Sequence, residues 1–79
     1  MDLKEEAEFK AFLKEFGYRV EKLIYEKFGS KGQFITETGF YKKSLHDILT
    51  GSRDMHLSKV YQLAKTLKIP LKKLFEGLD

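Results

Sequence analysis

Residues 30–51 read SKGQFITETGFYKKSLHDILTG, and this stretch decides the fold. Ser30 is followed three positions later by Gln33, which is the spacing of a capping box and predicts the start of a helix. Phe34 and Thr38 fall one turn apart. Gly39 then stands where the residue past a helix end takes a left-handed backbone. We therefore expect a short first helix that closes at Gly39.

A second helix is predicted for residues 41–50. Leu45, Ile48 and Leu49 recur at i, i+3 and i+4, which is the pattern of a helix with one aliphatic side. Phe40 is expected to fill the corner between the two helices, and Gly51 to end the second. The polar residues of this helix point away from its aliphatic side, toward solvent or a partner: Lys42, Lys43, His46 and Asp47.

The remainder of the chain is also predicted to be helical. Residues 3–28 carry a long apolar stripe and a second, shorter one of Ala11, Tyr18 and Tyr25. The long stripe comprises Phe9, Leu13, Phe16, Val20, Leu23 and Ile24. Gly17 leaves two alternatives open, a division into two helices or one long helix that is straight or bent there. We favour the single helix, which would be about 38 Å long.

Two more helices follow the central stretch. The first spans residues 57–68, with Asp54 or His56 as its cap. Its expected inward face consists of Leu57, Val60, Leu63, Ala64 and Leu67. Pro70 suits the first turn of a last helix because its missing N–H would be unpaired there. We expect an all-α fold of five helices in a single domain, residues 1–79, with residues 1–18 as an N-terminal helical extension.

Composition narrows the classes of function. Hydrophobic residues make up 42% of the 79-residue chain, which excludes a disordered chain. There is no cysteine, so disulfides and thiolate metal sites are not available, and no segment resembles a signal peptide or a membrane span. A cytoplasmic protein without a cofactor is the expectation.

Charge is distributed unevenly along the chain. Residues 1–29 hold six Lys or Arg against seven Asp or Glu, whereas residues 30–79 hold nine against five. A basic surplus on one half is typical of a face that meets phosphates. A solvated lysine surface is common in any soluble domain, however, and charge alone favours that explanation.

The ordered signals of residues 19–75 resemble the Cro/C1-type, XRE-like helix-turn-helix family of small repressors. The matching positions are Ser30, Phe34, Gly39, Phe40, Leu45, Ile48 and Gly51. The resemblance implies a lambda-repressor-like domain in which the second helix of the motif enters the DNA major groove. It also implies a repressor that binds a palindromic operator as a dimer. Five positions depart from the family pattern: Ile35 replaces a small Ala, Tyr41 a capping Ser or Thr, Lys31 a frequent Gln, Leu49 a frequent Glu and Met55 a frequent Pro.

The resemblance assigns roles to two sets of residues. The base-facing set is Lys42, Lys43, Ser44, His46 and Asp47. The phosphate-facing set is Lys31, Gln33, Tyr41 and Arg53. Arg53 has a structural alternative, a salt bridge with Asp54 in the same loop. The dimer contact is expected at the C-terminal helix or at the N-terminal extension.

Other functions have weaker signals. Ser44, His46 and Asp47 lie on one helix at spacings that make their side chains diverge, which disfavours a catalytic triad. Two histidines without cysteine do not predict a metal site. Gly29-Ser30-Lys31-Gly32 has the G-x-x-G pattern of the loop that binds the nucleic-acid backbone in KH domains, but that fold requires strands and none are predicted. The main rival is a protein-interaction module, such as an antitoxin or anti-repressor, that uses the N-terminal helix. That helix could equally fold back over its own core.

Overall fold

The computed structural model describes residues 1–78. Within this range the chain is all-helical and contains no strand. It forms four α-helices and one short 3-10 helix: α1 (Leu3–Phe28), α2 (Lys31–Thr38), α3 (Lys42–Thr50), α4 (Leu57–Leu67) and η1 (Leu71–Phe75).

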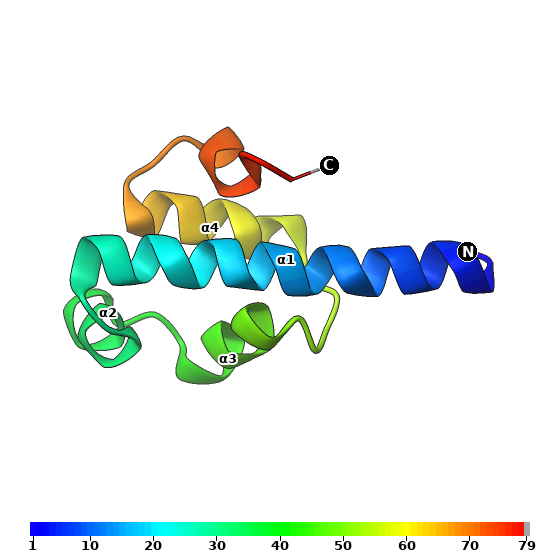
Figure 1. The fold of residues 1–79 in the computed structure, drawn as a ribbon. Coiled ribbons are helices and arrows are strands. Elements are labelled where there is room, and N and C mark those ends of the chain that lie inside the picture. Colours follow the sequence, from blue (N-terminus) through cyan, green and yellow to red (C-terminus); the bar gives the residue numbers. More distant parts are fainter. Residues whose placement is uncertain (79) are drawn as a thin grey trace.

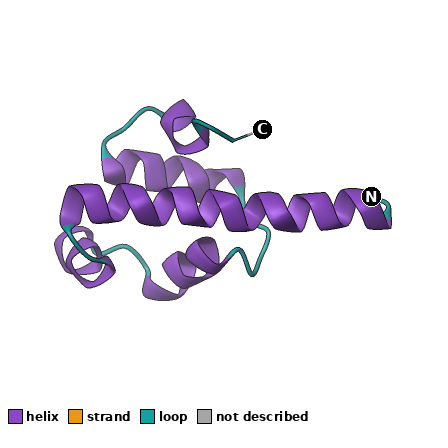
Figure 2. Cartoon of the chain, in the orientation of Figure 1, coloured by secondary structure: helices purple, strands orange, loops and turns teal. Residues whose placement is uncertain are grey.

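Helix α1 is the central rod of the molecule. It lies between α2 and α3 on one side and α4 with η1 on the other (Figure 1). Short loops join the helices, as the view by secondary structure shows (Figure 2). The helix has 26 residues, so at about 1.5 Å per residue it accounts for the 40 Å length of the molecule.

The continuity of α1 settles the alternatives at Gly17. The helix passes through Gly17 without interruption, and this glycine is buried. A Cβ atom there would lie 2.5 Å from the carbonyl oxygens of Ile48 and Leu49. Gly17 therefore allows α3 to approach α1 closely and does not interrupt α1. Nothing in the sequence indicated this role.

The N-terminal turns of α1 project beyond the other elements (Figure 1). Burial begins at Leu13, so the segment predicted as an extension, residues 1–18, is in fact divided. Residues 13–18 belong largely to the globular part, whereas residues 1–12 lie outside it, with only Phe9 and Phe12 partly buried. The alternative in which the whole segment folds back over its own core is wrong.

The hydrophobic core draws on every helix. Phe16, Phe34, Ile48, Leu63 and Leu74 are among its most deeply buried members, each at most 2% exposed. The predicted inward face of α4 is confirmed at Val60, Leu63, Ala64 and Leu67. Leu57 is an exception, because it stands in the first turn of α4 and is 71% exposed.

Helix ends follow the sequence signals closely around α2. The Ser30 Oγ accepts a hydrogen bond from the Gln33 amide at 3.0 Å, and Gly39 and Gly51 both have left-handed backbones. The reciprocal half of the capping box is not formed, because the Gln33 side chain donates to Glu37 instead, at 2.6 Å.

The later helix ends differ from the predictions. His56 occupies the position that precedes α4, but its side chain makes no capping hydrogen bond. The predicted fifth helix after Pro70 is a five-residue 3-10 turn rather than an α-helix. The chain is already extended at Glu76 and takes a positive φ at Gly77, so the turn has no room to lengthen.

Candidate nucleic-acid interface

Helix α3 is held against the molecule by its aliphatic side. Leu45 and Ile48 are 2% and 1% exposed, and they belong to the core. The backbone of α3 also approaches α1 closely, at Gly17 and again at Gly51, where a Cβ would lie 2.8 Å from the Lys14 nitrogen. Because two glycines replace side chains at this crossing, α3 has a firmly set position on the central helix.

The opposite side of α3 is open to solvent. Lys42, Lys43 and His46 are exposed, as predicted. Neither lysine forms an ion pair with any residue of the described range. These two ammonium groups are thus available to an external anion.

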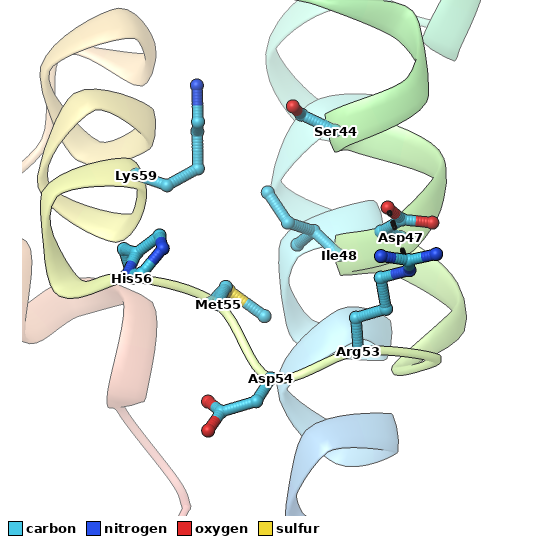
Figure 3. A pocket seen from close by; sticks show the side chains of 8 residues that line it. All are labelled: Ser44, Asp47, Ile48, Arg53, Asp54, Met55, His56 and Lys59. Carbon is cyan, nitrogen blue, oxygen red and sulfur yellow. Dashed lines mark ion pairs between the residues drawn. The ribbon is translucent and has the colours of Figure 1, made fainter.

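Ser44 and Asp47 lie elsewhere on α3. Both are half-buried and line a cleft of about 150 Å³ between α3, the following loop and the start of α4 (Figure 3). His46 instead lines a groove on the α2 side of the helix. The five predicted base-facing residues are therefore divided between an exposed edge and a cleft, and the side chains of Ser44, His46 and Asp47 do not converge.

Asp47 organises the loop after α3. Its carboxylate accepts a hydrogen bond from the Ser52 hydroxyl at 3.4 Å and lies 3.8 Å from the Arg53 Nε (Figure 3). The Ser52 amide donates to the Asp47 carbonyl oxygen, at 3.3 Å. The proposed salt bridge between Arg53 and Asp54 is not the one formed, because Arg53 turns back toward α3.

Arg53 nevertheless remains accessible. Its side chain is 70% exposed, whereas the Asp47 side chain is 22% exposed. An exposed pair of this kind contributes roughly 0–1 kcal/mol, so a phosphate can compete with Asp47 for the guanidinium.

The predicted phosphate contacts on α2 are exposed at its N-terminal end. Lys31 is paired with Glu21 of α1 at 3.7 Å, and Gln33 is held by Glu37. Tyr41, just before α3, is 66% exposed and caps nothing with its side chain. All three side chains reach solvent, and two of them have partners within the chain that an external phosphate must displace.

A groove of about 300 Å³ separates α2 from α3. Ile35, Leu45 and Leu49 contribute apolar atoms to its lining, and its other residues include Lys31, Lys42 and His46. Contacts between α2 and α3 are sparse compared with those that each makes with α1. Ile35 stands between the two helices as part of the lining of this groove.

Two basic residues near this face were not predicted from the sequence to belong to the site. His56 and Lys59 line the α3–α4 cleft opposite Ser44 and Asp47 (Figure 3). The Lys59 ammonium lies 5.9 Å from the centre of the Phe40 ring. No local pattern could have placed these side chains beside α3, because their position depends on how α4 packs.

Two features that would point to other functions are absent from residues 1–78. No group of three or more His, Cys, Asp or Glu side chains is arranged to hold a metal ion. No helix in this range combines the length and the apolar character needed to cross a membrane.

Comparison of the chain with protein-family models, with curated proteins and with solved structures found no match. We therefore infer the function from the residues of the candidate interface and their geometry.

Proposed function

We propose that this protein binds double-stranded DNA in a sequence-specific manner, with α3 in the major groove, and acts as a small dimeric transcriptional regulator of the repressor type. The main observation behind the proposal is the way in which α3 packs against α1. Its aliphatic side is buried against α1, while Lys42 and Lys43 at its start are exposed and unpaired within residues 1–78. A helix that is held in this way and carries two unpaired lysines at its start is suited to enter the groove between the two phosphate backbones of DNA.

The surroundings of α3 support the same proposal. Arg53 lies in the loop at one end of α3, and Lys31 lies at the start of α2, where free amides favour an anion. Contacts of these residues with phosphates would set the orientation of the protein on the duplex, and α3 would read the bases. In this arrangement Lys42, Lys43 and His46 are the direct readers. Ser44 and Asp47 act from the cleft beside them.

The resemblance to Cro/C1-type helix-turn-helix proteins supports the proposal independently of charge. The short helix, the left-handed Gly39, the buried Phe40 and the second short helix follow in the order that this family uses. The wide groove at Ile35 is the main departure, and we expect it to change the angle between α2 and α3 rather than the use of α3.

Measurement of DNA affinity as a function of salt tests the proposal. With about four cationic contacts on each protomer, a dimer makes about eight, so its affinity for a random duplex should fall roughly 10⁴-fold between 50 and 200 mM salt. The double variant Lys42→Glu, Lys43→Glu should lose most of this affinity, because it replaces two attractive charges with two repulsive ones.

The matched control is Lys22→Glu with Lys72→Glu, which changes the net charge equally at exposed positions of α1 and η1. Fluorescence anisotropy should show that the control keeps most of the affinity. Equal losses in both double variants, or wild-type binding insensitive to salt, would rule out α3 as the DNA-binding element.

A second candidate function is a protein-interaction module. The observation that favours it is the projecting start of α1, where Met1 and Leu3 are 80% and 86% exposed. An apolar protein contact would depend little on salt, so the same titration separates the two functions. Both can also hold together, with α3 binding DNA and α1 binding protein.

A further inference from the structure

The start of α1 is a helix without tertiary support. Its first turns project beyond the globular part (Figure 1), and in residues 1–12 only Phe9 and Phe12 are partly buried. A helical segment of this length is marginal in water unless one face packs against something. A covering partner would supply that packing.

One face of this segment is suited to such packing. Leu3, Ala7, Ala11 and Tyr18 fall at successive spacings of one or two turns, so they lie along one side of α1, nearly opposite its buried side. All four are exposed, Leu3 at 86% and Tyr18 at 72%. The small alanines between the two larger side chains permit another helix backbone to come close.

We propose that this face packs against the same face of a second copy, with the two α1 helices antiparallel about a two-fold axis near residues 9 and 10. In this register Ala7 lies opposite Ala11 of the second copy, and Leu3 covers Tyr18 of the second copy. This interface would form the dimer that the proposed function requires. Only the comparison with the spacing of DNA half-sites rests on the proposed function.

Charge complementarity selects the antiparallel arrangement. Lys4 and Glu15 flank one side of the apolar face, and Lys14 stands on the face itself between Ala11 and Tyr18. In the proposed register Lys4 meets Glu15 of the second copy, and symmetry doubles this pair. A parallel pair would bring opposite sides of the two faces together, so Lys4 and Glu15 would not meet.

The geometry of the antiparallel pair also suits DNA. Each α3 crosses α1 at Gly17, about 7.5 residues from the two-fold axis, which places the two crossings roughly 22 Å apart along the helices. Lys42 precedes Ile48 by six residues, so it lies up to about 9 Å farther out on each side. The resulting range of about 22–40 Å includes the roughly 34 Å between half-sites one helical turn apart.

Disulfide crosslinking tests the register directly, because the chain has no cysteine of its own. Ala7→Cys and Ala11→Cys variants are prepared separately and then oxidised, alone and mixed, without DNA. The mixture should form a linked dimer roughly tenfold faster than either variant alone, because only the mixed pair places two Cα atoms within disulfide range. A mixture of Ala7→Cys with Lys72→Cys is the control and should link slowly.

Other outcomes of this experiment contradict the proposal. Rapid linking of each variant alone would indicate a parallel pair, and uniformly slow linking would indicate that this face does not self-associate.

A charge exchange provides an independent test. Lys4→Glu should weaken dimerisation, measured by sedimentation without DNA, roughly five- to tenfold, because two attractive pairs become repulsive. Adding Glu15→Lys should restore it. A double variant no tighter than Lys4→Glu alone would overturn the register.

The two proposals can fail separately. A chain that links at Ala7 and Ala11 but shows no salt-dependent DNA binding would refute the proposed function and keep the interface. A chain that binds DNA as a dimer but fails both tests above would keep the function and refute the interface.

Discussion

Asp47 lies at the candidate site, but its side chain contacts other residues of the chain. The sequence placed it among the base-reading residues of α3, yet its carboxylate faces the loop, where it holds Ser52 and Arg53. In this position it sets the direction of the Arg53 guanidinium and also neutralises part of its charge. We infer that Asp47 tunes phosphate binding through Arg53.

Replacement of Asp47 by Asn should therefore strengthen binding to a random duplex by roughly threefold at low salt, because one repulsive charge is lost and Arg53 is released. Fluorescence anisotropy measures the change. Asp54→Asn is the matched control and should have a smaller effect. It removes the same charge from the loop that Asp47 contacts, and Asp54 has no partner among the ion pairs of residues 1–78.

The opposite result would reassign Asp47. If Asp47→Asn instead weakened binding to a selected operator while leaving random-duplex binding unchanged, Asp47 would be a base contact.

At the scale of elements, the crossing of α1 and α3 holds the candidate site in place. Gly17 and Gly51 remove two side chains from this contact, and the α3 backbone lies directly against α1. Any movement of α1 is therefore transmitted to the helix that carries Lys42 and Lys43. The turns of α1 before Leu13 extend the same rod away from the site (Figure 1).

Substitution of Gly17 by Ala should destabilise the protein, although alanine is ordinarily the better helix former. The added Cβ would meet two carbonyl oxygens at 2.5 Å, and we expect a loss of about 1–3 kcal/mol in the free energy of unfolding. Urea denaturation measures this loss.

Gly32→Ala is the control for this experiment, because Gly32 lies inside α2 and its Cβ would come no closer than 4.0 Å to the Ser30 Oγ. It should stabilise the protein by about 0.5–1 kcal/mol. A Gly17→Ala variant as stable as Gly32→Ala would show that the α1–α3 contact adjusts freely.

At the scale of the whole molecule, one domain of this size reads only a few base pairs, so the proposed regulator needs two copies on one duplex. The antiparallel α1 pair proposed above would fix the distance between the two α3 helices. Because α1 is continuous from Leu3 to Phe28, that distance should be rigid.

An operator selected from random duplexes should consequently contain two half-sites at a fixed spacing. Insertion of about five base pairs between them turns one half-site to the opposite face of the duplex and should lower the affinity by about 100-fold, to that of a single half-site. Gel-shift titration measures the loss. Affinity that is unchanged by the insertion would mean that the copies bind independently.

The sequence predicted the local elements well where a local interaction determines them. The Ser30 cap, the left-handed Gly39 and Gly51, and the buried Phe40, Leu45 and Ile48 all follow from side chains and backbone preferences within one or two turns. The same reasoning was less successful at the far end, where it predicted an α-helix and η1 is a 3-10 turn.

What the sequence determined by itself was the all-helical character of the chain, most helix boundaries and the lysine-bearing face of α3, because helical periodicity and capping are short-range effects. The tertiary structure alone decided the purpose of Gly17, the partner of Arg53, the division of the polar α3 residues between two sides, and the presence of Lys59 beside them. Each of these depends on a contact between helices that are distant in the chain, and such contacts leave no periodic pattern in the residues that make them.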